Sequence, residues 1–245
     1  MLNQAQLNEL KKYDSPTICN AIEFFDLRPK TAGFMNPGIK KIFQNDKRTV
    51  GYACTAKISA LHPPTDEQKK LNDRYYAALH DAPKPSVTVI QDLDPAPVGS
   101  FWGEVQATTH RALGCEGVVT SGGVRDLDEV KELNFEYYSA CVLVSHAYIH
   151  LVEVGTPVTV GGMTVNPGDL VFADKHGVIV IPPEVEPHLA DACRAAAQAE
   201  QPVLSNCRRY FDALVDVKDL VGWRAEMVKL RADATAKFSR MIRKA

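Results

Sequence analysis

The sequence predicts an α/β fold with a βαβ parallel core, an antiparallel β segment after it, and helices at the C-terminal end. Three observations support this prediction. Apolar runs at residues 86–90 and 117–120 flank a helical stretch at 100–113, and strands joined through a helix pair in parallel. Short β-branched runs separated by glycine and proline turns fill residues 157–181, as in antiparallel strands. Helical periodicity then returns after residue 183.

Composition excludes several classes of protein. The 245 residues are 45% hydrophobic, which is enough for a large core. The net charge of -2 argues against a positively charged surface of the kind that binds nucleic acid. No apolar run approaches the ~20 residues that cross a bilayer, and the N-terminal segment has no signal-peptide pattern. The 6 cysteines are scattered without a CxxC pair, which argues against zinc-ribbon and thioredoxin-like sites. We therefore expect free thiols, a cytoplasmic location, and neither membrane nor nucleic-acid partners.

The N-terminal third is predicted to alternate helix, loop and strand. Ser15 as N-cap and Pro16 at the first helical position indicate a helix start. Its apolar face carries Ile18, Ala21, Ile22 and Phe25. Residues 28–45 predict a long loop, 52–59 a strand and 66–80 a polar helix.

The βαβ unit and its continuation follow. A buried strand is predicted at 86–90 and a helix at 100–113, with Gly114 where a C-terminal cap belongs. A second strand is predicted at 117–120. A short helix at 126–133 and a strand at 137–144 complete this region.

The remaining chain predicts a compact antiparallel set and then helices. A hairpin at 157–165 turns at Gly161 and Gly162, and strands at 170–173 and 178–181 flank a second turn. Helices are expected at 184–200 and 219–242, the last one amphipathic. We expect one domain over 1–245, with a core of about 15–183 and a C-terminal helical extension at 184–245.

The first candidate site is the turn at residues 99–104, Gly-Ser-Phe-Trp-Gly-Glu, between a predicted strand and a predicted helix. Backbone N–H groups at a helix N-terminus bind anions, and glycine lets a ligand approach the backbone. A carboxylate or phosphate fits such a turn. The alternative is an ordinary connection in which Ser100 caps the helix.

The second candidate site is Gly122-Gly123-Val124-Arg125-Asp126, at the carboxyl end of the next parallel strand. Ligands of α/β sheets bind at such ends. Arg125 can hold a carboxylate or an enolate oxygen, and Asp126 can ligate a hard divalent cation. The alternative is that Asp126 caps the following helix, with Glu129 completing a capping-box variant.

Three further residues raise the question of a metal site. His146, His150 and Glu153 have a spacing that places two histidines on one face of a helix. The apolar residues around them indicate a strand instead, so we expect surface histidines, with His146 the nearer one to the site.

Other acidic residues are expected to shape loops. Asp92 and Asp94 flank a turn before Pro95, with an outer-shell carboxylate role as the alternative. The segment at 174–177 is expected to form a β-turn with Gly177 at a positive φ.

With these motifs in view, the chain resembles the family of the regulator of ribonuclease E activity A (RraA-like). That family also contains 4-hydroxy-4-methyl-2-oxoglutarate and 4-carboxy-4-hydroxy-2-oxoadipate aldolases. The matching segments are WGEVQATTHRALGCEGVVTSGGVRDLDEV (102–130) and PVTVGGMTVNPGDLVFADKHGVIVIP (157–182). Weaker similarity covers SPTICNAIEFFDLRP (15–29) and VGYACTAKI (50–58).

The resemblance implies a swivelling β/β/α-type fold, a homotrimer that can stack into a hexamer, and dependence on Mg2+ or Mn2+. By position, Asp126 corresponds to the catalytic metal ligand and Arg125 to the catalytic, substrate-binding arginine. Glu104 is expected to be catalytic too and to help hold the water shell of the metal. The backbone that binds the pyruvoyl carboxylate corresponds to Gly103, Glu104, Val105 and Gln106. In the aldolases a neighbouring subunit adds an acidic residue from its C-terminal region, where Glu200 lies here without a secure match.

The chain departs from typical aldolases at an insertion around 61–85, at Ser145-His146 and in a C-terminal extension beyond Asn206. The predicted function is a divalent-metal-dependent lyase of small 2-oxo acids, with the class II aldolase and oxaloacetate decarboxylase activities. It cleaves a 4-hydroxy-2-oxo acid to pyruvate through a stabilised enolate. The alternatives are a non-catalytic protein that regulates a ribonuclease, and a metal-enolate isomerase or hydratase of a sugar-derived acid.

Overall fold

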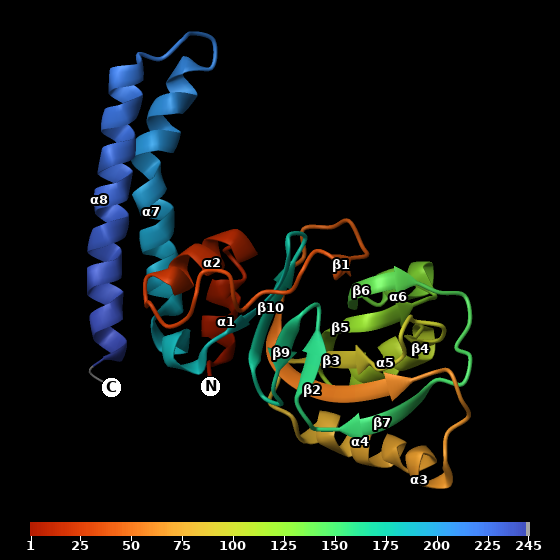
Figure 1. Ribbon diagram of the computed structural model, residues 1–245. Helices are drawn as coiled ribbons and strands as arrows, with labels where there is room; N and C mark the ends of the chain where they lie inside the picture. The colour runs from red at the N-terminus through yellow and green to blue at the C-terminus, as the bar shows by residue number, and fades with distance from the viewer. Residues whose placement is uncertain (244–245) are drawn as a thin grey trace. The chain divides into compact units, whose positions relative to one another are not determined.

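The computed structural model describes residues 1–243 (Figure 1). The chain divides into two compact units, one formed by Ala32–Pro182 and the other by Met1–Thr31 together with the chain from Pro183 onward. Residues 15–31, which the sequence analysis assigned to the core, therefore cluster with the C-terminal helices. The prediction of one domain over 1–245 stays a prediction.

A mixed sheet of nine strands, counted over the described residues, forms the centre of the larger unit. Its path is β1-β6-β5-β3-β2-β10-β11, with β4 beside β5 and β7 beside β2. The strands are β1 (Lys40–Lys41), β2 (Thr49–Ser59), β3 (Ser86–Asp92), β4 (Ser100–Trp102), β5 (Cys115–Val124), β6 (Glu136–Val142), β7 (His150–Val154), β10 (Leu170–Asp174) and β11 (Gly177–Ile181). Strands β2, β3, β5 and β6 pair in parallel, which confirms the predicted βαβ core and the α/β fold.

The predicted antiparallel segment is also confirmed. Strands β8 (Val158–Val160) and β9 (Met163–Val165) form a hairpin, and the φ angles of Gly161 and Gly162 are 55° and 76°. Two successive positive φ values define the turn that matches the twist of paired strands. Strands β10 and β11 turn at residues 174–177, where the His176 N–H donates to Asp174 Oδ1 at 2.8 Å and φ of Gly177 is 145°.

Helices and the hairpin cover opposite faces of this sheet. The helices are α3 (Asp66–Lys69), α4 (Leu71–Asp81), α5 (Glu104–Ala112) and α6 (Leu127–Glu132). One buried cluster joins α4, α5 and α6 to alternate strand residues such as Cys54 and Tyr137. A second cluster joins the hairpin to Ala53 and Tyr138, which are the sequence neighbours of Cys54 and Tyr137 and point to the other face of the sheet. The period-2 alternation of strand side chains thus builds two cores.

The predicted helix at 100–113 is wrong at its start. Residues 100–102 form β4, which pairs with β5, and α5 begins only at Glu104. Ser100 does not cap the helix, because its hydroxyl donates within the sheet region to Trp102 O at 2.7 Å and Gly123 O at 2.8 Å. The end of the helix is as predicted, with Gly114 at φ 79°.

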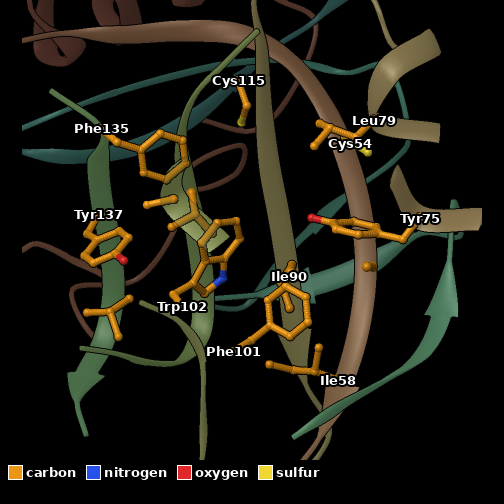
Figure 2. Packing of buried hydrophobic residues seen from close by; sticks show 14 of the residues in the cluster. Cys54, Ile58, Tyr75, Leu79, Ile90, Phe101, Trp102, Cys115, Phe135 and Tyr137 are labelled. Carbon is orange, nitrogen blue, oxygen red and sulfur yellow. The ribbon is translucent and has the colours of Figure 1, made fainter. Parts of the chain in front are cut away.

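The core on the helical side is rich in aromatic rings (Figure 2). Trp102 packs against His110, Phe135 and Tyr137, with ring centroids 4.5, 5.8 and 6.4 Å away. His110 is fully buried, with Nδ1 2.6 Å from Gln106 O and Nε2 2.7 Å from the Tyr75 hydroxyl. A carbonyl oxygen only accepts, so Nδ1 carries the proton and Tyr75 donates to Nε2. Burial lowers the pKa of His110 to about 4, so the ring is neutral.

The smaller unit is helical, and Figure 1 shows α7 and α8 lying side by side in it. Its elements are α1 (Gln4–Leu10), α2 (Ser15–Glu23), the 3-10 turn Pro183–His188, α7 (Leu189–Cys207), the 3-10 turn Arg208–Tyr210 and α8 (Val217–Ile242). Phe238 of α8 is buried between Phe24 and Phe25, at centroid distances of 6.3 and 5.3 Å. Glu200 lies 3.8 Å from Arg231.

Some helix boundaries in this unit differ from the predictions. Asp14, not Ser15, is the N-cap of α2, and its carboxylate accepts from Thr17 N at 2.9 Å. The helix predicted at 184–200 begins at Leu189, after a 3-10 turn. Helix α1 was not predicted, although Asn3 and Gln6 form a capping box there.

Two expectations from composition have a structural outcome. The six cysteines are free thiols, as expected. Over residues 1–243, no helix combines the length and the apolar character that crossing a membrane requires.

Candidate functional site

Strand β4 brings the two candidate motifs together. It pairs with the end of β5, with Ser100 opposite Gly123 and Trp102 opposite Val124. The turn into α5 therefore lies beside the residues that follow β5. The Arg125 N–H donates to Trp102 O at 3.0 Å, and the Glu104 N–H donates to Asp126 Oδ2 at 2.9 Å. Two motifs that are 22 residues apart in the sequence thus form one site.

Asp126 does not cap the following helix, which was the alternative to its role as a metal ligand. It occupies the N-cap position of α6, but its backbone is left-handed, with φ 54° and ψ 52°, and its side chain makes no capping bond there. The capping box with Glu129 is therefore wrong. The carboxylate instead caps α5 through the Glu104 N–H. Left-handed backbone at a non-glycine residue costs roughly 1–2 kcal/mol, and such strain concentrates at functional sites.

Gly103 permits the close approach of these groups. It is the N-cap of α5 with an extended backbone. A Cβ atom at this position would lie 2.4 Å from Asp126 Oδ2 and 3.2 Å from Arg125 Nε. A side chain would therefore displace the carboxylate and the guanidinium, so the turn requires glycine.

The charged groups of the site remain accessible. The side chains of Arg125 and Asp126 are 35% and 36% exposed, and Arg125 Nε lies 3.9 Å from Asp126 Oδ1. Val105 is 78% exposed in the first turn of α5. Gln106 Oε1 accepts from the Tyr76 hydroxyl at 2.9 Å, and the backbone N–H of Gln106 lies in the first turn of α5, where it has no partner within the helix. The predicted residues Gly103, Glu104, Val105, Gln106, Arg125 and Asp126 thus lie in one place.

The oxygen donors present suit a hard cation. Asp126 and Glu104 are carboxylates on adjoining turns, and Mg2+ binds proteins through one or two carboxylates with water and substrate oxygens filling the other positions. Residues 1–243 contain no group of three or more His, Cys, Asp or Glu side chains that could hold an ion without such help. The donor set therefore fits Mg2+ or Mn2+ with a chelating substrate.

The histidines do not form a metal-binding helix face. His150 lies in β7, as the strand interpretation predicted, and Glu153 Oε2 accepts from Lys57 Nζ at 2.7 Å. Nδ1 of His146 donates to the Ala147 carbonyl oxygen at 2.7 Å. The backbone of His146 does lie against Gly99, where a Cβ atom would be 2.5 Å from His146 O.

Asp92 and Asp94 shape the loop that follows β3, as predicted. Asp94 accepts from the Ser59 hydroxyl and the Ala60 N–H, at 2.6 and 2.7 Å. Asp92 Oδ1 accepts from Asp94 N, whereas its buried Oδ2 has no hydrogen-bond partner among the described residues. Burial raises the pKa of Asp92.

The sequence analysis missed one residue at this site, Tyr137 of β6. Burial raises its pKa; the charge of Asp126 adds to this rise and that of Arg125 opposes it, so the phenol lies within the field of the pair. In the sequence it is one aromatic residue of a strand, with no pattern that marks it.

A hollow of ≈ 250 Å3 lies beside α6. Its lining residues are Ile42, Phe43, Gln44, Asn45, Leu127, Asp128 and Lys131. It is therefore next to the Arg125–Asp126 turn along the chain, but neither residue lines it.

Comparison with known proteins assigns the chain to a family. Residues 15–180 match the profile of the RraA-like family, described as Aldolase/RraA. The chain belongs to the RraA-like family. This match confirms the resemblance that the two motifs carry. As an RraA-like protein, the chain belongs to a group that includes both aldolases and ribonuclease E inhibitors.

Individual relatives agree with this assignment. An uncharacterized protein of Methanocaldococcus jannaschii is 27% identical over 216 residues, which are 87% of this chain and 94% of the relative. A protein of Halalkalibacterium halodurans named putative 4-hydroxy-4-methyl-2-oxoglutarate aldolase is 25% identical over 183 residues, 74% of this chain and 80% of that one.

A solved structure shows the same fold. Streptomyces coelicolor RraAS2, described as an unusual member of the RNase ES inhibitor RraA family, matches with a TM-score of 0.65. The match has 22% identity and covers 82% of this chain and 96% of that chain. At this identity the likeness concerns the fold.

Proposed function

We propose that this RraA-like protein is a divalent-metal-dependent lyase of 2-oxo acids, which cleaves a 4-hydroxy-2-oxo acid to pyruvate and also decarboxylates oxaloacetate. The observation that carries the proposal is the junction at Gly103. There the accessible Asp126 carboxylate accepts the N-terminal Glu104 N–H of α5 at 2.9 Å, and the accessible Arg125 guanidinium lies 3.9 Å from the same carboxylate. The similarity to a protein named putative 4-hydroxy-4-methyl-2-oxoglutarate aldolase supports the same reaction class.

Substrate binding follows from the donors at this junction. The Arg125 guanidinium presents a planar fork of N–H donors that suits a carboxylate or an enolate oxygen. The N–H groups of Val105 and Gln106 lie in the first turn of α5, where they have no partner within the helix. A 2-oxo carboxylate can therefore bind with its carboxylate at the α5 turn and its oxo oxygen toward Arg125.

Asp126 would hold the cation, with Glu104 nearby, in the mode that suits Mg2+ or Mn2+. When bound, the divalent cation supplies Lewis-acid polarisation of the 2-oxo carbonyl. Arg125 donates to the C2 oxygen, where negative charge develops as the C3–C4 electron pair moves to form the enolate. The C4 hydroxyl loses its proton and becomes a carbonyl. Glu104, on the adjoining turn at the start of α5, is the carboxylate that can accept this proton, and protonation of C3 then yields pyruvate.

The test is release of pyruvate, followed with a lactate dehydrogenase couple. Oxaloacetate and 4-hydroxy-4-methyl-2-oxoglutarate are offered with Mg2+, with Mn2+ and with a chelator. We expect metal-dependent release that Arg125→Ala abolishes and Arg125→Lys weakens mainly through a higher KM, because lysine keeps the charge and loses the fork. Arg111→Ala, at an exposed arginine in the last turn of α5, is the matched control and keeps the wild-type rate.

Other outcomes of this assay would favour one of the two alternative functions. A rearranged or dehydrated product without pyruvate from a sugar-derived acid would indicate an isomerase or hydratase. No turnover of any acid, together with binding to a ribonuclease that Asp126→Ala leaves intact, would indicate a regulator.

We also propose that the protein assembles as a homotrimer or hexamer. Light scattering coupled to size exclusion tests this proposal, since a mass of one 27.0 kDa chain would contradict it.

A further inference from the structure

The hydroxyl of Tyr137 is a buried hydrogen-bond donor that has no acceptor within the part of the chain that the structure describes. Tyr137 is 0% exposed, and its hydroxyl has no hydrogen-bond partner among the described residues. Its neighbour Tyr138 is equally buried, but that hydroxyl lies 3.0 Å from Ala173 O and 3.2 Å from Thr49 Oγ1. An unpaired buried hydroxyl costs free energy, and phenylalanine would fill the same ring space without this cost. Packing alone therefore does not explain the hydroxyl.

The place of Tyr137 connects it to the site. Its ring faces the helical side of the sheet, stacks on Phe43 at 5.5 Å and meets Trp102 edge-on at 6.4 Å. Figure 2 shows the hydroxyl at the edge of the ring on the Trp102 side. Trp102 is the residue before Gly103, and its carbonyl oxygen accepts the Arg125 N–H. Tyr137 therefore packs against the strand residue that adjoins the junction of Arg125 and Asp126.

Asp126 has an acceptor oxygen to spare. Oδ2 accepts the Glu104 N–H at 2.9 Å, while the nearest charged donor to Oδ1, Arg125 Nε, is 3.9 Å away and beyond hydrogen-bonding distance. A carboxylate that binds a cation is normally oriented by hydrogen bonds from neighbouring groups. Among the described residues, Tyr137 is thus a buried donor without a partner that packs against the residue before the site, and Asp126 is an acceptor with spare capacity.

We propose that Tyr137 is a positioning residue, whose hydroxyl donates to the Asp126 carboxylate in the cation-bound site and fixes the direction of its metal-binding oxygen. The inference rests on the proposed role of Asp126 as metal ligand. In this inference the Tyr137 hydroxyl contributes to cation binding and not to the stability of the fold. It therefore predicts that stability and cation affinity respond in opposite ways when the hydroxyl is removed.

The experiment compares Tyr137→Phe with Tyr138→Phe, two removals of one oxygen at adjacent buried positions on opposite faces of the sheet. Urea unfolding is measured without metal, and Mn2+ binding to the full chain is measured by electron paramagnetic resonance. We expect Tyr137→Phe to be at least as stable as the wild type and to bind Mn2+ about 10-fold more weakly, the usual loss for an outer-shell partner. Tyr138→Phe should be less stable and should bind Mn2+ with wild-type affinity.

Three results would overturn the inference in distinguishable ways. If Asp126→Asn loses Mn2+ binding while Tyr137→Phe binds like the wild type, Tyr137 has no positioning role and the proposed function stands. A loss of stability in Tyr137→Phe equal to that in Tyr138→Phe would make the hydroxyl structural. If the wild type itself binds no Mn2+, the proposed function fails and the inference fails with it.

Discussion

Replacing Asp126 separates its structural role from its chemical role. The carboxylate accepts the Glu104 N–H at 2.9 Å, and the backbone is left-handed, with φ 54°. Asp126→Ala removes the acceptor and leaves a residue that tolerates this φ poorly. Asp126→Asn keeps an oxygen that accepts the same N–H, and asparagine adopts left-handed backbone readily. Asparagine therefore removes the negative charge and exchanges one carboxylate oxygen for an NH2 group, while it keeps the bond to Glu104 N–H.

The expected free-energy changes follow from these contacts. Loss of a capping acceptor costs about 1 kcal/mol, and alanine in left-handed backbone costs about another 1 kcal/mol relative to a tolerant residue. Asp126→Ala should therefore destabilise by about 2 kcal/mol, which lowers Tm by roughly 4–8 °C for a protein of this size. Asp126→Asn should stay within about 0.5 kcal/mol of the wild type, because a conservative change that keeps the bond is near neutral.

The assays are urea unfolding and pyruvate release on the same preparations. Both variants should lose turnover, although only the alanine variant loses stability. Asp126→Gly is the control for backbone strain, and it should cost about 1 kcal/mol because it loses the acceptor alone. Equal stability of the alanine and asparagine variants would refute the capping argument. Wild-type turnover in the asparagine variant would refute the role of the charge.

Three further predictions follow from the packing. Gly103→Ala should abolish turnover in a folded protein, since its Cβ would lie 2.4 Å from Asp126 Oδ2; wild-type kinetics would contradict this. Gly222→Ala, in open space on α8, should instead stabilise by up to about 1 kcal/mol by urea unfolding, and destabilisation would show an unrecognised contact. The pKa of His110 is lowered from 6.5 to about 4, so the unfolded chain binds its proton first as the pH falls. Its contribution to stability is complete above pH 6.5 and is lost as the pH falls toward 4, by about 2 kcal/mol between pH 7.5 and pH 5. Urea unfolding of His110→Gln should lack this component, and an equal pH dependence in variant and wild type would contradict the assignment.

Local signals predicted the elements whose ends are marked in the sequence. The apolar runs around α5 and the cap at Gly114 predicted the βαβ core, and Gly161-Gly162 predicted the hairpin. The start of α5 could not be predicted in this way. Residues 100–102 form a strand because they pair with the end of β5, more than twenty residues further along the chain. Local helix signals do not include that partner.

The site shows the same division between local and long-range information. The spacing of Asp126 and Glu129 fits a capping box, yet the carboxylate bonds across to Glu104 because β4 lies against β5. The resemblance assigned Arg125, Asp126 and the Gly103 turn to one site, and the structure brings them together, whereas their roles in catalysis stay predictions. Tyr137 could not be predicted from the sequence, because only the packed core shows that its buried hydroxyl has no partner among the described residues.

The most direct measurement of the central claim is the removal and return of the metal. The wild type and Asp126→Asn are treated with a chelator, and oxaloacetate turnover to pyruvate is then followed as Mg2+ is added back, with the uncatalysed rate at each Mg2+ concentration subtracted. We predict that the wild type loses activity with the chelator and regains it with Mg2+, whereas Asp126→Asn stays inactive at every concentration. Wild-type turnover that persists in the chelator, or Mg2+-restored turnover in the asparagine variant at the wild-type rate, would contradict a metal-dependent lyase that works through Asp126.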